Sequence, residues 1–193
     1  NVRLRGDDQQ KSNKGGIMLK IILGVIVVLV AGIFILAAMK PDVFRVERSA
    51  AIKAPPEKVF ALINDFKAWT RWSPWEKKDP AMQRSYGAVT AGKGATYGWN
   101  GNNNVGQGSM EITDATAPSK IELKLDFIKP MEGHNTVVFT LAPQGEMTQV
   151  NWTMQGPTPF IGKIIHVFIN MDKMVGGDFE QGLANLKAVA EKN

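Results

Sequence analysis

Residues 121–127 read Ile-Glu-Leu-Lys-Leu-Asp-Phe, so the apolar side chains of Ile121, Leu123, Leu125 and Phe127 alternate with charged ones. A period of two is typical of a strand that has one face buried and the other in water. This segment is the clearest strand of the chain. We expect it to lie in the middle of a run of similar segments.

Strand patterns continue on both sides of this segment. Toward the C-terminus, residues 136–141 and 148–154 flank a turn at Pro143-Gln-Gly145. Toward the N-terminus, Tyr97 and Trp99 precede an Asn-Gly step that is typical of a hairpin turn, and residues 105–113 return from it. Because the strands follow one another in hairpin-like succession, we predict an antiparallel sheet.

The remaining elements are one earlier strand and two helices. Residues 44–52 alternate as a strand does, with Arg48 as a charge on the inward phase, and a helix is expected from Pro56 to about Ala68. After Pro157 and Pro159 the rest of the chain has helical spacing up to Ala190. Gly176-Gly177 interrupt this helix and should loosen it by about 1 kcal/mol each.

A single antiparallel sheet covered mainly by a long amphipathic helix is an α+β arrangement. A strongly curved sheet that grips such a helix is not filled completely by side chains. We therefore expect a cavity between the sheet and the helix.

The N-terminal part contains an apolar run. Residues 21–39 are 19 consecutive uncharged residues between Lys20 and Lys40, which is enough to cross a hydrocarbon core of roughly 30 Å. A cleaved signal peptide and a buried core helix are the alternatives. The run lacks the polar stripe of a core helix, and Leu36-Ala37-Ala38 is a poor cleavage site. We predict an uncleaved, single-pass transmembrane anchor at residues 18–40, followed by one domain at residues 41–193.

Residues 1–17 have two interpretations. They are either a disordered polar tail or untranslated upstream sequence read in frame, with translation starting at Met18. The choice changes the balance of Lys and Arg around the anchor, and that balance determines orientation. We expect the cytoplasmic (inner) membrane as the location and leave open which side the domain faces.

Charge and cysteine content exclude several classes of function. The chain of 193 residues carries 23 Lys+Arg and 18 Asp+Glu, a net charge of +5. Residues 41–193 hold 17 basic and 16 acidic side chains, so the domain itself is close to neutral and nucleic acid is not an expected partner. The absence of Cys excludes disulfides, thiolate nucleophiles and Cys-based metal sites.

No catalytic residue, metal site or cofactor is predicted. The two histidines, His134 and His166, lack the spacing of metal ligands, and no Gly-x-Ser-x-Gly nucleophile motif occurs. The acidic candidates carry no sequence signal of burial, which a raised pKa would require. These candidates are Glu111, Asp114, Asp126 and Asp178.

Four segments in order resemble a known family. They are 44–48 (Phe-Arg-Val-Glu-Arg), 54–60 (Ala-Pro-Pro-Glu-Lys-Val-Phe), 69–76 (Trp-Thr-Arg-Trp-Ser-Pro-Trp-Glu) and 171–187, all following the anchor. Together, over residues 19–191, they resemble membrane-anchored members of the SRPBCC superfamily, the START-like proteins of polyketide-cyclase/dehydrase type. The resemblance implies a helix-grip fold with a deep apolar cavity. It carries over no catalytic residues, because the superfamily shares a cavity rather than a motif.

We expect a membrane-anchored domain that binds a hydrophobic or amphipathic small molecule, such as a lipid or isoprenoid, without chemistry. A cyclase/dehydrase-like enzyme and an interaction protein with a filled core are the alternatives; the sequence does not identify a protein partner. Trp69, Trp72 and Trp75 could rest at the membrane interface, line the cavity mouth or pack in the core. The residues expected to line the cavity are Trp99, Phe127, Phe139, Trp152, Met154, Met171, Met174 and Phe179.

Overall fold

The computed structural model describes residues 3–192, and contacts within it divide the chain into two compact units. The helical unit contains the residues up to Pro41 together with Pro159–Ile169. The sheet unit contains Asp42–Thr158 and the residues from Asn170 onward.

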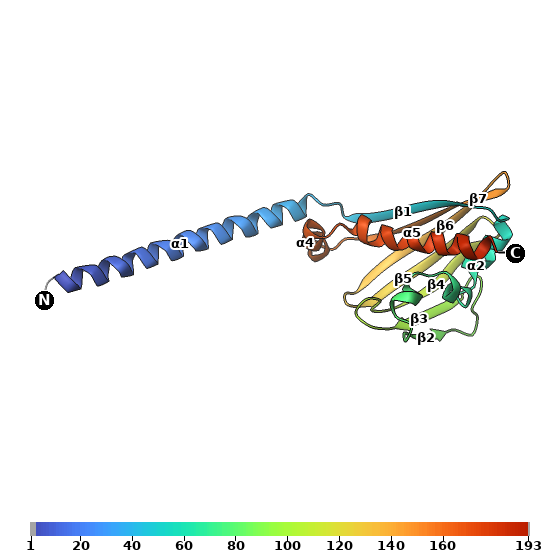
Figure 1. The fold of residues 1–193 in the computed structure, drawn as a ribbon, viewed down its shortest axis with the longest axis horizontal. Helices are drawn as coiled ribbons and strands as arrows, with labels where there is room; N and C mark the ends of the chain where they lie inside the picture. The colour runs from blue at the N-terminus through green and yellow to red at the C-terminus, as the bar shows by residue number, and fades with distance from the viewer. Residues whose placement is uncertain (1–2, 193) are drawn as a thin grey trace. The chain divides into compact units, whose positions relative to one another are not determined.

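The sheet unit is built on one antiparallel sheet, as the sequence predicts. Within the described residues, seven strands pair in the order β1-β7-β6-β5-β4-β3-β2 (Figure 1). The strands are β1 (Val43–Ile52), β2 (Gln83–Tyr86), β3 (Thr96–Asn100), β4 (Gln107–Thr116), β5 (Lys120–Lys129), β6 (Gly133–Gln144) and β7 (Met147–Pro157). The edge strand β2 was not predicted from the sequence.

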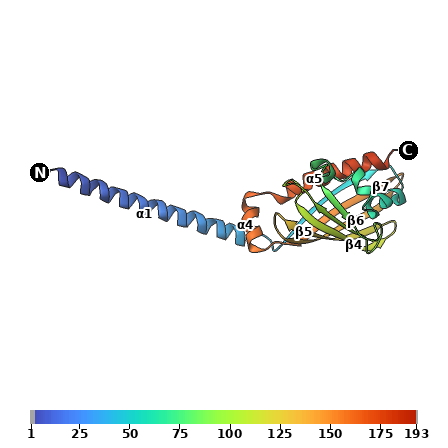
Figure 2. The same ribbon diagram turned by 90° about the horizontal axis from the view of Figure 1, so that it is seen from below.

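Helices cover one face of this sheet. The longest is α5 (Met171–Ala190), and Figures 1 and 2 show it lying across the curved sheet beside β1. We call the side of the sheet toward α5 the inward face. The other helical segments are α2 (Pro56–Asn64), η1 (Ala68–Arg71) and α3 (Trp75–Lys78). The predicted α+β class, a curved antiparallel sheet around a long C-terminal helix, is confirmed.

The contact between Arg48 and α5 explains both the charge on the inward phase of β1 and the glycine at position 176. Arg48 points inward from β1, and its guanidinium donates to both carboxylate oxygens of Asp172 at 2.9 and 3.0 Å and to Glu180 at 2.7 Å. These hydrogen bonds hold the pKa of the Asp172 carboxyl below its usual range. A Cβ at position 176 would lie 2.1 Å from Nη2 of Arg48, so Gly176 gives the guanidinium the space to lie against α5.

The helical unit contains α1 (Arg3–Ala38) and α4 (Phe160–Phe168). The part of α1 from Gly16 to Ala38 is long and apolar enough to cross a membrane. Its helix begins well before the predicted anchor, and residues 1–2 of the predicted tail lie outside the described residues. The helix expected after Pro159 is present but divided, because it ends at Phe168 and restarts at Met171 with Asn170 as N-cap.

Candidate functional site

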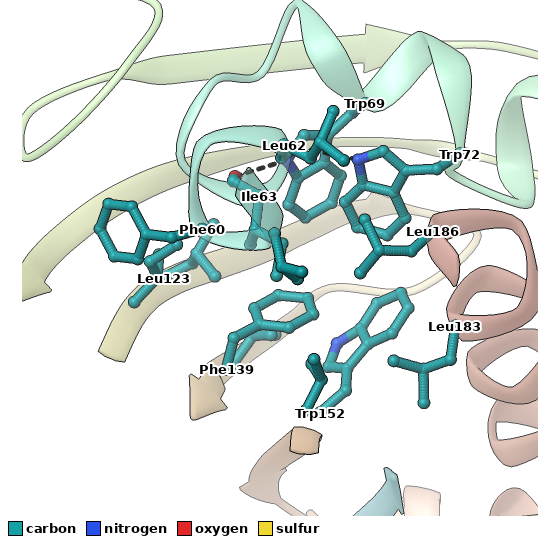
Figure 3. Packing of buried hydrophobic residues seen from close by; sticks show 14 of the residues in the cluster. Phe60, Leu62, Ile63, Trp69, Trp72, Leu123, Phe139, Trp152, Leu183 and Leu186 are labelled. Atoms are coloured by element: carbon teal, nitrogen blue, oxygen red, sulfur yellow. Dashed lines mark hydrogen bonds between the residues drawn. The ribbon is translucent and has the colours of Figure 1, made fainter. Parts of the chain in front are cut away.

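A cluster of aromatic and aliphatic side chains lies between the sheet and α5 (Figure 3). At its centre the ring of Trp152 is stacked on Phe179, with ring centroids 4.0 Å apart, and it lies 4.8 Å from Phe139. Trp72 approaches Trp152 edge-on, with centroids 5.7 Å apart. Trp152 is only 2% exposed and Phe139 is fully buried, so these predicted cavity residues lie deep in the unit.

The three tryptophans considered for the membrane interface belong to this same cluster. Trp69 and Trp72 are buried, and their indole nitrogens donate to the backbone oxygens of Ile63 at 2.8 Å and Leu62 at 2.9 Å. Trp75 is half-buried and contacts the ring of Trp152, with centroids 5.9 Å apart. A buried indole with its N–H satisfied is not available to a bilayer, so the structure places Trp69 and Trp72 in the core-packing alternative.

One polar atom in this cluster has no partner. Nε1 of Trp152 is buried and finds no hydrogen-bond acceptor among the described residues. Leaving a buried donor unpaired costs about 1–3 kcal/mol. Within residues 3–192 this N–H group is therefore left without an acceptor among apolar rings.

Burial along the inward face changes from one end to the other. At one end Ile52 of β1, Leu141 of β6 and Ala190 of α5 are buried, whereas Ala50, Ala115 and Val189 are half-buried. At the opposite end the inward-facing apolar side chains are only half-buried, and we call this the open end. It consists of Phe44, Trp99, Met110, Phe127 and Val175.

Strand register brings Trp99 and Phe127 of the open end together across β4. Trp99 of β3 and Phe127 of β5 both lie opposite Gly108 of β4, and their rings meet edge-on with centroids 5.8 Å apart. A Cβ at position 108 would lie 2.5 Å from the ring of Trp99, so only glycine lets this ring lie against β4. Phe44 of β1, the strand at the opposite edge of the sheet from β2, pairs with Gly156 of β7.

Asn135 provides a polar group on the inward face at this same end. It shares the face of Val137 and Phe139 on β6 and lies opposite Leu125 of β5. The side chain is buried, and Gly156 makes room for it, because a Cβ there would lie 2.1 Å from Oδ1 of Asn135. An amide offers both a donor and an acceptor to a molecule at the open end.

A second polar cluster lies near the β2–β3 edge. Nε of Arg84 donates to the Glu76 carboxylate at 2.9 Å, and Nη2 of Arg84 contacts the same oxygen. The phenol of Tyr97 points to the other Glu76 oxygen at 3.5 Å. Burial, together with the Glu76 charge, raises the pKa of Tyr97 above its usual range, so the phenol stays protonated. Because the guanidinium occupies the carboxylate, the cluster favours a structural ion pair over a general base.

The predicted cavity residues divide into three groups by burial. Trp99 and Phe127 are half-buried at the open end, whereas Phe139, Trp152, Met154 and Phe179 are buried deeper in the unit. Met171 is half-buried at the start of α5, and Met174 is 54% exposed. Met174 directly precedes Val175 in α5, so its side chain is rotated by about 100° around the helix axis and lies on the solvent side.

Sequence reasoning missed several residues of the site. Phe44 and Met110 carried a signal, since both are apolar residues in alternating segments. Asn135 carried one as well, because it is a polar residue in phase with Val137 and Phe139. Glu76 and Arg84 come from different elements, and no local pattern predicts their pairing.

The arrangement of a curved antiparallel sheet around a C-terminal helix, with an apolar inward face, defines a helix-grip domain. The chain belongs to the family described as polyketide cyclase / dehydrase and lipid transport, whose model matches residues 43–191. This match confirms the resemblance to the SRPBCC superfamily. No match was found among curated proteins.

Solved structures share the fold at low sequence identity. Protein CV1439 from Chromobacterium violaceum is 17% identical, with a TM-score of 0.56 over 80% of this chain and 100% of its own. The Aha1 dimer from Colwellia psychrerythraea is 16% identical, with a TM-score of 0.56 over 77% of this chain and 96% of its own. Ara h 8.0201 is 12% identical, with a TM-score of 0.53 over 78% of this chain and 99% of its own. At these identities the likeness extends to the fold alone.

Proposed function

We propose that this protein is a membrane-anchored domain that binds a hydrophobic or amphipathic small molecule at its open end without catalysing a reaction. The family description, which includes lipid transport, supports this class of ligand. The observation that carries the proposal is the burial gradient along the inward face. Large aromatic side chains from several strands stay half-buried at one end, whereas at the other end Ile52 and Leu141 are buried and the half-buried strand residues are the alanines Ala50 and Ala115.

The physical gain comes from covering these side chains. Removing apolar surface from water yields about 25 cal/mol per Å², and a ligand placed on Trp99 and Phe127 would cover surface of both rings. Small-molecule sites combine such an apolar lining with a few placed polar groups. The Asn135 amide, on the inward face at this end, is the polar group that would orient an oxygen-bearing ligand.

The membrane anchor is the second part of the proposal. The apolar stretch of α1 has 23 residues, which at 1.5 Å per residue gives about 35 Å, more than the roughly 30 Å of a hydrocarbon core. A tethered domain moves a lipid-like ligand over a short distance only. We place the protein in the cytoplasmic membrane as a single-pass protein.

A role in binding is favoured over catalysis by the polar groups near the inward face. The Glu76 carboxylate, which lies near the phenol of Tyr97, is paired with Arg84. This pairing supports a site that holds a molecule by contact and by hydrogen bonds.

Phe127→Glu is the variant that tests the binding site. The full chain is purified in a mild detergent, and native mass spectrometry measures the small molecules that remain bound to it. We expect wild type to carry a hydrophobic adduct close to one per chain. Phe127→Glu should lose most of this adduct, because a carboxylate would replace an apolar ring at the open end.

Met147→Glu is the matched control. Met147 is 40% exposed at the start of β7, at the opposite end of the sheet from Phe127. This variant introduces the same charge and keeps the same anchor, so lipid held by the anchor itself contributes equally to both measurements. If both folded variants retained the same adduct as wild type, the ligand would not bind at the open end and the proposal would fail.

A further inference from the structure

The helix α4 exposes an unusually apolar surface. Residues 160–168 read Phe-Ile-Gly-Lys-Ile-Ile-His-Val-Phe, and every residue of the helix is at least partly exposed. Phe160, Ile161 and Phe168 are 46%, 62% and 69% exposed. Its polar positions, Lys163 and His166, are three residues apart and therefore share one side of the helix. A short helix with this much exposed apolar surface requires a partner that covers it.

The contact between α4 and α1 indicates that this partner is the membrane. The ring of Phe160 stacks on Phe34 of α1, with centroids 5.7 Å apart, and both helices belong to the helical unit. Phe34 lies four residues before the end of α1 at Ala38, which corresponds to about 6 Å along the helix axis. In a membrane-spanning α1, this level is where the helix leaves the hydrocarbon region.

We infer that α4 is a membrane-interface helix that lies in the leaflet from which α1 emerges. Its exposed apolar side chains enter the acyl boundary, and Lys163 and His166 extend toward the lipid headgroups. Nine residues alone would bind a bilayer weakly. The covalent link to the anchor supplies a high effective concentration at the surface, so α4 does not need strong binding of its own. This inference rests on the anchoring role proposed for α1.

The chain enters and leaves the sheet unit at the same end of β1 and β7. Val43 of β1 pairs with Pro157 of β7, and the N–H of Thr158 donates to the backbone oxygen of Asp42 at 2.7 Å. The chain therefore passes from the anchor into β1, and from β7 into α4, at neighbouring points. Phe44 of the open end is the second residue of β1.

The experiment uses single cysteines, which the Cys-free chain permits without background labelling. Ile161→Cys, Phe168→Cys, Val27→Cys and Met147→Cys are each labelled with the environment-sensitive fluorophore NBD in the full chain. The labelled chains are reconstituted in vesicles of phosphatidylethanolamine and phosphatidylglycerol. These vesicles contain lipids with a nitroxide either near the headgroup or near the end of the acyl chain. The exposed positions tolerate the label because it replaces no buried contact.

We expect the labels at Ile161 and Phe168 to show blue-shifted emission and to be quenched most by the shallow nitroxide. The label at Val27, in the middle of the apolar stretch, should be quenched most by the deep one, and the label at Met147 by neither. Deep quenching at Val27 without quenching at Ile161 or Phe168 would overturn the role of α4 and leave the anchor standing. No quenching at Val27 would overturn the anchor itself, so the two failures are distinguishable.

Discussion

Replacing Trp152 by alanine is expected to lower the free energy of unfolding by about 3–5 kcal/mol, because the change removes a large ring from a closed aromatic cluster. The ring is 2% exposed and lies between Phe179 and Phe139. Urea unfolding of the full chain in detergent, followed by near-UV circular dichroism, measures the loss. Trp99→Ala serves as control. Its ring is half-buried at the open end, so its loss should be about 1–2 kcal/mol.

Trp152→Phe keeps the test informative if the alanine variant does not fold. The phenyl ring retains most of the contacts with Phe179 and removes the unpaired N–H, and the removal recovers part of the roughly 1–3 kcal/mol that an unpaired buried donor costs. We expect a loss less than half that of the alanine variant. Equal losses in the two variants would show that ring packing does not determine stability at this position.

The local patterns in the sequence predict most of the sheet unit, because hydrophobic alternation is a property of neighbouring residues. Two differences have non-local causes. The helix expected to end near Ala68 ends at Asn64, where the chain turns to make backbone pairs with a distant segment: the N–H of Phe66 donates to Thr90 at 2.9 Å. The strand β2 has four residues and forms only by pairing with β3, so it carries too short a pattern to detect.

The break between α4 and α5 had a local signal that the spacing of apolar residues concealed. Asn170 is a favoured N-cap residue, and its side chain accepts a hydrogen bond from the N–H of Lys173 at 3.0 Å. Apolar residues continue at helical intervals across the break, so periodicity alone indicates one helix. The N-cap residue Asn170 therefore indicates that this segment forms two helices and not one.

The candidate site was less predictable than the fold, because alternation gives the face of a side chain and not its depth. Trp99 and Trp152 are the same residue type on the same face of the sheet, yet one is half-buried and the other nearly inaccessible. That difference depends on where α5 crosses the sheet, and no local pattern encodes this position. Arg48 and Gly176 likewise looked unfavourable separately and are complementary only in contact.

Gly182→Ala and Gly177→Ala are expected to have opposite effects on stability although both replace a glycine within α5. Alanine has a better helix propensity than glycine by about 1 kcal/mol, and a Cβ at position 177 meets no atom within 4 Å. Gly177→Ala should therefore raise the free energy of unfolding by up to about 1 kcal/mol.

A Cβ at position 182 would lie 2.7 Å from Cζ3 of Trp152 and 3.2 Å from Pro74. The Trp152 ring cannot move away easily, because Phe179 is stacked on it with centroids 4.0 Å apart and Phe139 lies at 4.8 Å. Overpacking of this kind costs about 1–3 kcal/mol or more, which exceeds the gain in helix propensity. Urea unfolding of the two full-length variants measures the difference, and equal stabilisation by both would show that the Trp152 ring can be displaced at little cost. In that case the interior beside α5 could also open to admit a ligand, and the unpaired N–H of Trp152 would be within its reach.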